Sequence, residues 1–498
     1  MDALSELIAL LDNSELKLFK HYLKQNNKRN DVKNIQLLEL IKTDDINGLK
    51  KLYGDAKNND AYHALRKRLQ DSLLSFLSQR AFETDHSETH DALRLVVIGR
   101  ALLEKELNKI AWKCLDKAER IAERLEQFNL LNELLMLKIQ YAHLPEAEPF
   151  EALTLRFEQN QQNMQREARL NIAYAFLRHE LKEIHLKGKI VDLRRLMLAT
   201  LRKYQISIKD LMSYRSVHQL LYLANEYAAI QHNYQLIEQL VNRTDQVMQR
   251  RNGPERPYLY YQLSILYLLA NFHLRRRSFQ KSSEYLDQMM DLMNTDGRYY
   301  TQFILGHRLL SGLNLFFTGF ANEATHLMQA ALSGSKRRYR PEDIEDIRIS
   351  ITMFMALRND RQCLKQLTLL THTDAWYEKK MGMLWTIRKN LMEILIHAQF
   401  SNIELAMSRL NTFKRRYRKY LLSTSEERVI QYLKLVERYL TKPDVIHDPA
   451  YKKAVNALLT NAGDHDLFVI SFIAWLMARW DKRTAYEIAL DVLKEKRH

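Results

Sequence analysis

Residues that make tight turns are scarce in this sequence, because only 12 of its 498 residues are glycine and 7 are proline. An average chain contains roughly 7% glycine and 5% proline. Sandwiches, barrels and doubly wound folds need these residues, together with Asn and Asp, at nearly every turn. Long helices joined by short polar loops need far fewer of them. The scarcity therefore predicts an all-α fold.

The apolar residues recur with the period of a helix. In segments 63–77 and 402–422 they return every three or four residues, and Ile403, Ala406 and Leu410 fall on one stripe. A single hydrophobic core stops growing at roughly 250–300 residues. A chain of 498 residues must therefore form several domains or an extended array of helices, and the scarcity of turns favours the array.

Prolines and a change in charge indicate where the chain divides. Pro145 and Pro149 stand where the charge balance changes, since the first 150 residues carry 23 basic and 24 acidic residues and the rest carry 53 and 36. Because proline interrupts helices, we expect loops here and at Pro341, Pro443 and Pro449. The predicted segments are an N-terminal helical bundle or cap (1–85), the first helix pairs (86–145), a basic helical-repeat array (150–442) and C-terminal capping helices (443–498).

Small residues recur at one spacing in three places. Gly99 is followed by Ala111, Leu115 and Ala118, at intervals of 12, 4 and 3 residues. A small residue late in one helix lets the following helix cross close to it, and small residues in that second helix let the next pair dock. The other two copies are Gly312, Ala324, Met328 and Ala331, and then Ala270, Ser282, Leu286 and Met289.

This pattern resembles the tetratricopeptide repeat, a helix–turn–helix unit of about 34 residues. It covers three segments, about 92–125, 263–296 and 305–338. The resemblance implies a right-handed superhelix of stacked antiparallel helix pairs, whose concave groove holds a peptide or a partner helix. It places Asn271 in that groove, at a position resembling the family's ligand clamp, with Tyr267 one turn earlier. The lysines that would complete a carboxylate clamp are missing from the matching positions.

Residues 1–85 do not follow the repeat. Their apolar pattern predicts helices at 2–11, 14–26, 31–42 and 59–80. A helical array needs atypical ends, because its terminal apolar face has no neighbour. We therefore expect this segment to be a cap or small bundle, and the most suitable place for a separate effector function.

Motifs for phosphate binding and nucleophilic catalysis are excluded by glycine spacing. The closest glycines, such as Gly48 and Gly54, are six residues apart. The loops GxGxxG and GxxxxGK and the nucleophile elbow GxSxG all need closer pairs. The two cysteines, Cys114 and Cys363, lie far apart without a CxxC motif, which excludes a disulfide framework and a zinc knuckle.

Two histidine motifs come near to metal sites. His86 and His90 are four residues apart among acidic residues, so a helix would place both on one face. The same segment suits a polar connector equally well. The sequence HELKE at 179–183 has a glutamate where HExxH has its second histidine. We therefore predict no metal, no cofactor and no enzymatic activity.

Basic clusters lie in the later part of the chain. Some of their charge stands where helices end and complements the helix dipole. If the clusters line one face, they could instead follow a phosphate backbone, with neighbouring tyrosines stacking on bases. Four acidic residues at 342–346 oppose that interpretation. The clustered residues are Arg275, Arg276, Arg277, Lys336, Arg337, Arg338, Arg340, Lys414, Arg415, Arg416, Arg418 and Lys419.

The N-terminus carries acidic residues among its apolar ones, unlike a signal peptide. The longest nearly uncharged apolar stretch, 467–478, is shorter than the roughly 20 residues that span a bilayer. We therefore expect a soluble, cytoplasmic protein.

The sequence favours a non-catalytic scaffold or adaptor that binds a protein or peptide partner in a concave groove. Two alternatives stay open at this point. One is an RNA- or DNA-binding repeat protein that uses the basic clusters of 151–498. The other is a peptide-sensing regulator with an N-terminal effector bundle.

Overall fold

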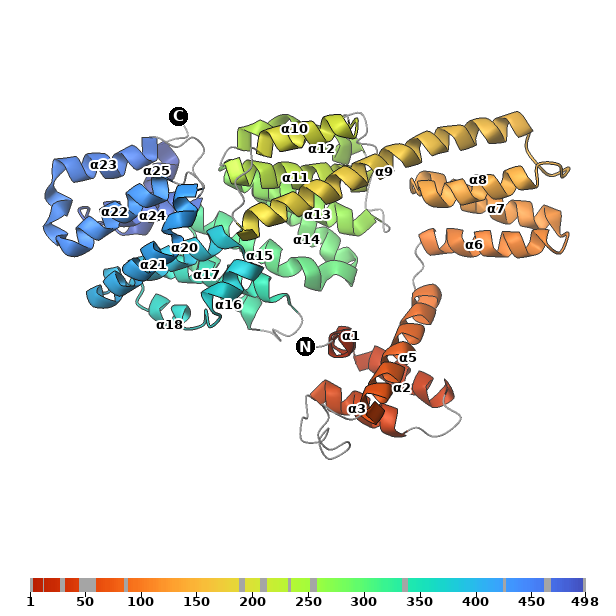
Figure 1. Ribbon diagram of the computed structural model, residues 1–498, viewed down its shortest axis with the longest axis horizontal. Coiled ribbons are helices and arrows are strands. Elements are labelled where there is room, and N and C mark those ends of the chain that lie inside the picture. Colours follow the sequence, from red (N-terminus) through yellow and green to blue (C-terminus); the bar gives the residue numbers. More distant parts are fainter. Residues whose placement is uncertain are drawn as a thin grey trace. The chain divides into compact units, whose positions relative to one another are not determined.

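The computed structural model consists of helices and connecting loops (Figure 1). No strand occurs within the described residues, and the predicted all-α class is confirmed. The structure describes residues 3–11, 13–26, 32–43, 60–84, 88–187, 193–206, 213–231, 234–250, 258–333, 339–423, 427–460 and 467–495.

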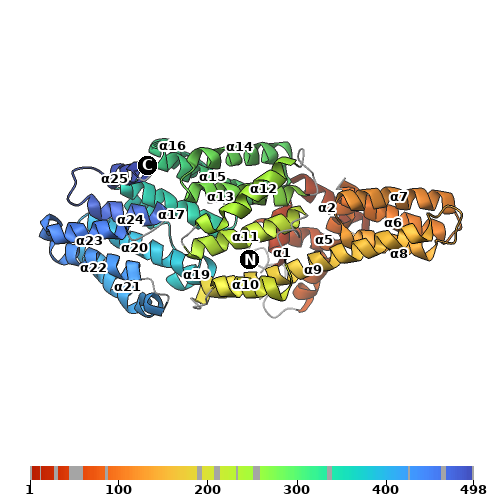
Figure 2. The ribbon, with the colours of Figure 1, turned by 90° about the horizontal axis from the view of Figure 1, so that it is seen from above.

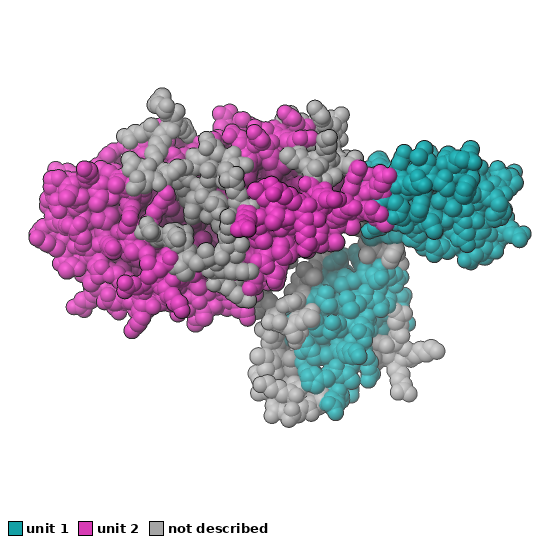
Figure 3. Space-filling model, turned by 45° about the horizontal axis from the view of Figure 1, so that its top comes forward, with its two compact units in different colours: residues 1–161 teal, residues 162–498 magenta. Residues whose placement is uncertain are grey.

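The chain divides into two compact units, Met1–Gln161 and Gln162–His498, called unit 1 and unit 2 below (Figure 3). The boundary between them falls within a long helix, α9 (Phe150–Lys187). Before it, unit 1 contains α1 (Ala3–Leu10), α2 (Asn13–Asn26), α3 (Val32–Thr43), α5 (Asp60–Thr84), α6 (Glu88–Leu103), α7 (Asn108–Arg124) and α8 (Phe128–Gln140).

The first four helices surround a small core of their own. Phe19, Leu37, Leu69 and Leu73 are fully buried in it, and the rings of Phe19 and Phe76 lie 5.2 Å apart. The helices predicted at 2–11, 14–26 and 31–42 are present within one residue at each end, while the one predicted at 59–80 extends to Thr84.

Helices α6, α7 and α8 pack around a second core centred on Leu115 and Leu134. Helix α7 crosses α6 where Gly99 has no side chain, because a Cβ there would lie 2.7 Å from Leu115 Cδ2. The close approach expected from the spacing of Gly99 and Leu115 is therefore present.

Unit 2 continues from the end of α9 as pairs of helices in two layers. Helices α11, α13, α15 and α17 form one layer, and α14 and α16 lie outside it (Figure 2). The elements are α10 (Leu193–Lys203), α11 (Tyr214–Gln231), η3 (Tyr234–Ile237), α12 (Glu238–Arg250), α13 (Leu259–Arg275), α14 (Phe279–Thr295), η5 (Gly297–Tyr299), α15 (Tyr300–Phe317), α16 (Ala321–Leu332), α17 (Pro341–Leu357), α18 (Cys363–Leu367), α19 (Asp374–Lys380), α20 (Met383–Gln399), α21 (Ile403–Ser423), α22 (Glu427–Thr441), η7 (Pro443–His447), α23 (Pro449–Thr460), α24 (Leu467–Met477) and α25 (Ala485–Glu495).

The same small-residue contacts join the helix pairs of unit 2. A Cβ on Gly312 of α15 would lie 2.5 Å from the terminal methyl of Met328 on α16. In the α13–α14 pair, the Ser282 hydroxyl donates to the Ala270 carbonyl over 2.8 Å. The three copies of the sequence pattern thus mark three close helix crossings.

One type of turn recurs between helices, although glycine is almost absent from it. After α13, Arg277 has a positive φ of 59°, its N–H donates to Leu274 O, and the Ser278 N–H donates to His273 O. This is the Schellman arrangement, which usually carries glycine at the left-handed position. From Arg277 to Ser401 the turn returns at intervals of 42, 40 and 42 residues. The left-handed residues are Glu106, Glu126, Gln205, Arg277, Gly319, Asn359 and Ser401.

The C-terminal helices pack back onto the middle of unit 2. The Tyr486 hydroxyl of α25 donates to the Phe316 carbonyl of α15 over 2.8 Å, and Phe316 stacks on Phe354 of α17 at 3.8 Å. In an open array each pair would contact only its neighbours. The long-range contact exists because Phe316 and Tyr486 bury their rings against each other, with centroids 4.5 Å apart.

Three prolines predicted to mark loops begin helical elements instead. Pro341, Pro443 and Pro449 are the first residues of α17, η7 and α23. The first position of a helix suits proline, because the missing N–H would have no intrahelical partner there. The expectation of loops was wrong by one position, since each loop ends just before its proline.

No helix of the described chain is long and apolar enough to cross a membrane. The apolar helix α24 has only 11 residues.

Candidate functional site

A continuous row of rings crosses α9, α11, α13, η5 and α15 in unit 2, and we call it the aromatic belt. Most of its rings are half-buried, so they combine fixed positions with an accessible face. Its members are Tyr174, His218, Tyr222, Tyr260, Tyr261, Tyr299 and Phe303.

The belt begins between α9 and α11. Tyr174 meets Tyr222 edge-on at 6.1 Å between ring centroids, and Tyr222 lies 6.4 Å from His218. The exposed Arg178 guanidinium lies 5.9 Å from the Tyr174 ring and 5.7 Å from the Tyr222 ring. A guanidinium within about 6 Å of an aromatic ring gains cation–π attraction, so Arg178 stays close to the belt.

The belt continues onto α13 and α15. His218 lies 5.6 Å from Tyr261 and 6.2 Å from Tyr260. Tyr260 in turn lies 5.7 Å from Tyr299 and 5.6 Å from Phe303. Each helix therefore contributes at least one ring that touches the next.

A second arginine is held against the belt. The Arg215 Nε donates to the Tyr261 hydroxyl over 3.1 Å, and its guanidinium pairs with Glu167 at 3.2 Å. These contacts link α9, α11 and α13, because the three residues come one from each helix.

Helical spacing puts the belt residues on matching faces. Tyr174 and Arg178 are four residues apart on α9, as are His218 and Tyr222 on α11, so each pair shares a face. Burial, and secondarily the charge of Arg178, lowers the pKa of His218 to about 4. Burial also raises the pKa of Tyr222 to about 12. Both side chains are therefore neutral at neutral pH and act as aromatic surfaces rather than as acids or bases.

The two residues predicted to line a groove lie on α13 beside the belt. Tyr260, Tyr267 and Asn271 are separated by seven and four residues, so they form one half-buried stripe. The Tyr267 ring rests on Gly306 of α15, where a Cβ would lie 3.1 Å from Tyr267 Cε2. Their role in binding a partner stays a prediction.

Charged residues from two predicted basic clusters converge near Tyr267. Burial raises the pKa of Tyr267 to about 12, helped by Asp346 and Asp343, while Arg275 and Arg340 act in the opposite direction. Arg340 binds Asp343 through two hydrogen bonds of 2.9 and 2.8 Å. The acidic residues of α17 thus neutralise part of the cluster that precedes them.

The basic cluster on α21 is also partly paired. Lys414 forms an ion pair with Glu437, and Arg416 binds Glu378 at 2.9 Å. Arg415, Arg418 and Lys419 of the same cluster are exposed. Arg276 and Arg277 are half-buried at the end of α13, and Lys336, Arg337 and Arg338 lie outside the described residues.

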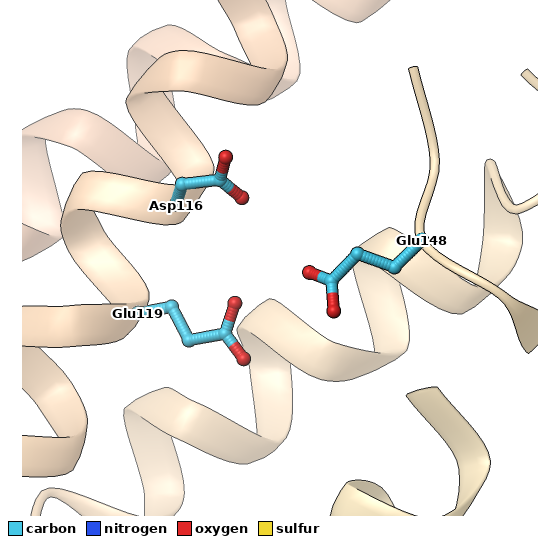
Figure 4. A group of neighbouring side chains, drawn as sticks. All are labelled: Asp116, Glu119 and Glu148. Carbon is cyan, nitrogen blue, oxygen red and sulfur yellow. The ribbon is translucent and has the colours of Figure 1, made fainter. Parts of the chain in front are cut away.

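Among the described residues, neither His90 nor His179 belongs to a cluster of potential metal ligands. His86 lies outside the described residues, and His179 is exposed on α9. One group of carboxylates does come together: Asp116, Glu119 and Glu148, whose nearest oxygens lie within 4.8 Å of one another. Figure 4 shows these side chains pointing toward one another.

The centre of that group is already occupied by the fully buried ammonium of Lys138. It binds Asp116 at 2.6 Å and Glu148 at 3.2 Å, and it also pairs with Glu119. Burial lowers the pKa of Lys138, but the hydrogen bonds that it donates to Asp116 and Glu119, together with their negative charge, outweigh burial, so that the pKa is raised. The lysine supplies the positive charge that a metal would supply, and the group is structural.

Sequence reasoning missed most of the aromatic belt. It singled out Tyr267 and Asn271 of α13, which lie beside the belt. The signal that could have found the remaining belt residues is the four-residue spacing of Tyr174 with Arg178 and of His218 with Tyr222. That spacing did not reveal that α9 and α11 lie side by side.

Comparisons with known protein families and with curated proteins identified no relative of this chain. No known protein family matches the chain, and a search of curated proteins finds no match.

Proposed function

We propose that this chain is a non-catalytic, TPR-like helical-repeat scaffold whose unit 2 binds a protein or peptide partner through the aromatic belt. The observation that carries the proposal is the continuity of the belt across α9, α11, α13 and α15, flanked by Arg178 and Arg215. Tyrosine and arginine are the residue types that dominate binding energy in protein interfaces.

The geometry of the belt also favours tight binding. Each ring is held by its neighbours and by the helix beneath, so little side-chain freedom remains to be lost on binding. The proposed architecture is a right-handed superhelix of antiparallel pairs, supported by the close crossings at Gly99, Gly312 and Ala270. The spacing of about 40 residues between equivalent turns exceeds the roughly 34 residues of the tetratricopeptide repeat. The likeness therefore concerns packing rather than repeat length.

The test is selection of peptides from a random library on the immobilised full-length protein, followed by affinity measurement on individual peptides. Replacing Tyr260 and Arg178 by alanine should lower the affinity for the selected peptides by at least about tenfold, because tyrosine and arginine often dominate binding energy in interfaces. The control is Phe320→Ala, which removes an exposed phenylalanine (53% exposed) of unit 2 outside the belt. Peptides that bind the belt variant as tightly as the wild type would refute the proposal.

The predicted groove residues extend the same test. Tyr267→Ala and Asn271→Ala should each lower the affinity for peptides that also contact the α13 stripe. If only the belt variant loses affinity, the partner contacts the belt and the groove prediction is wrong.

The nucleic-acid alternative is favoured by one observation. Arg415, Arg418 and Lys419 stand three and four residues apart, exposed on one face of α21. Titration with labelled single-stranded RNA at two salt concentrations tests it, since phosphate contacts make affinity fall steeply with salt. The double substitution Arg415→Gln and Arg418→Gln should then reduce both the affinity and its salt dependence. An unchanged affinity would dismiss this alternative.

A further inference from the structure

A cleft of about 640 Å³ opens between α12 and α14 in unit 2, and we call it the α12–α14 cleft. Helix α13 forms its floor, with Leu266, Leu269 and His273 facing the space. These residues lie three to four positions apart, which puts them on one face of the helix. That face is opposite to the stripe of Tyr260, Tyr267 and Asn271, because successive residues turn by about 100°. The cleft is therefore distinct from the aromatic belt.

The floor of the cleft is apolar. Leu266 is 4% exposed and Leu269 is fully buried, and Val241 of α12 continues the same surface. Binding sites for small molecules typically combine such a floor with a few fixed polar groups, in volumes of roughly 300–1,000 Å³. The cleft has this size and this type of floor.

The walls of the cleft carry an excess of negative charge. Asp245 stands on α12, and Glu284 and Asp291 stand on α14, while Lys281 is the cation of the lining. The Tyr285 hydroxyl donates to Asp245 over 2.7 Å and so joins the two walls. Within the described part of the chain these carboxylates do not converge as metal ligands do, so the negative charge is spread along the cleft.

The side chain of a buried histidine on the floor has no hydrogen-bond partner among the described residues. His273 is 8% exposed and its ring stacks on Tyr285 at 5.4 Å between centroids. Its ring nitrogens form no hydrogen bond with any described residue. Burial, followed by the charge of Lys281, lowers the pKa of His273. The neutral ring therefore offers an acceptor nitrogen to a donor that enters the cleft.

We infer that the α12–α14 cleft binds an elongated organic cation, an aliphatic chain that ends in an amine or guanidine. The aliphatic chain packs on Leu266 and Leu269, and the cationic end donates to the wall carboxylates and to His273. The cation can come from a free polyamine-type molecule or from a lysine or arginine side chain of a peptide. The recognition chemistry is the same for both sources.

The test is calorimetric titration of the full-length protein at neutral pH with 1,5-diaminopentane, pentylamine and pentanol. The three probes share one carbon chain and carry two, one and no positive charges. We expect affinity to fall in that order, by about tenfold for each lost charged contact. Equal affinity for the amines and the alcohol, or no binding of either amine, would overturn the inference. Titration with N-acetyl-lysine methylamide separates the sources, because binding shows that a peptide side chain fits and failure restricts the site to free amines.

Substitutions in the α14 wall test whether the amines bind in the α12–α14 cleft. Glu284→Gln together with Asp291→Asn keeps the shape of the wall and removes two charges, so diaminopentane should bind at least about tenfold more weakly. The matched control is Asp287→Asn, an exposed carboxylate on the same helix that does not line the cleft, and it should leave affinity unchanged.

A second variant fills the space rather than changing its charge. Gln288 is an exposed residue of the α14 wall, so Gln288→Trp places a ring over the cleft without disturbing the core. It should abolish binding of both amines while the unfolding transition stays in place. Undiminished binding by either variant would show that the amines bind elsewhere, and the inference would fail.

Discussion

Unit 1 and unit 2 both bury polar groups between stacked helices, but they satisfy them differently. In unit 1 the fully buried Lys138 is surrounded by Asp116, Glu119 and Glu148. In unit 2, the joint between α13, α14 and α15 uses neutral groups, where Asn314 donates to Ser282 over 2.9 Å and Ser282 donates to a backbone carbonyl.

The two kinds of buried polar joint differ in how much stability is lost when one of their groups is removed. A buried ion pair stabilises a protein little more than apolar residues of similar volume in its place. Removing only one partner, however, leaves a buried charge without compensation and is strongly destabilising. A neutral hydrogen bond costs less to break. Unit 1 should therefore be the more sensitive of the two to single substitutions at its polar joint.

The largest effect is expected for Lys138→Met. Removing the ammonium leaves Glu119, whose side chain is 5% exposed, facing two other carboxylates, with Arg156 at 2.8 Å as its remaining ion-pair partner among the described residues. Unit 1 should therefore lose about 3–5 kcal/mol of unfolding free energy. Denaturant unfolding with hydrogen exchange in α7 and α8 measures it. The control is Lys113→Met, an exposed lysine of α7, which should change stability by no more than about 0.5 kcal/mol. A stable Lys138→Met variant would remove the proposed contrast.

The next effect should be equal in the two units, because it concerns apolar packing. Gly99→Val and Gly312→Val each insert a side chain into a fully packed crossing, against Leu115 and Met328. Each should cost about 1–3 kcal/mol. Gly297→Ala is the control, since a Cβ there meets nothing within 4 Å. If only one of the two valine variants is destabilised, the units do not share this packing.

A loss in the same range, and below that of Lys138→Met, is expected for Ser282→Ala in unit 2. Asn314, which is 3% exposed, would lose its hydrogen-bond acceptor, at a cost of about 1–3 kcal/mol. Thermal unfolding beside the adjacent exposed control Ser283→Ala measures it. A loss as large as that of Lys138→Met would contradict the distinction between charged and neutral joints.

The last prediction concerns pH and involves a carboxyl of unit 2. Burial raises the pKa of Asp346 from 3.8 to about 7, partly offset by its hydrogen bond from Trp385 Nε1 at 2.8 Å. Between these values the folded state binds more protons than the unfolded state, so stability falls as pH rises from about 4 to 7. Asp346→Asn should flatten this slope. Trp385 fluorescence should also lose any transition near pH 7 in the variant, and an unchanged profile would assign the transition to another group.

Much of the fold could be predicted from the sequence by local physical rules. Few glycines and prolines, together with the helical period, were enough to predict an all-α chain and most helix ends of the N-terminal bundle. Gly99 and Gly312 were predicted to mark close helix crossings, because a position without a side chain lets the next helix approach closely. The turns were harder. Arg277 and Gln205 adopt the left-handed conformation, which costs such residues roughly 1–2 kcal/mol, so only the surrounding packing selects it.

The sites depended on tertiary structure. The belt joins Tyr174 to Phe303, and the α12–α14 cleft is formed by Asp245, His273 and Asp291, residues from different helices. Periodicity shows which residues share a face of one helix, but it does not show which helices are neighbours. Likewise, Lys138 on α8 is an ordinary lysine in sequence. It becomes the centre of a buried ionic network only because α7 and the segment before α9 bring three carboxylates to it.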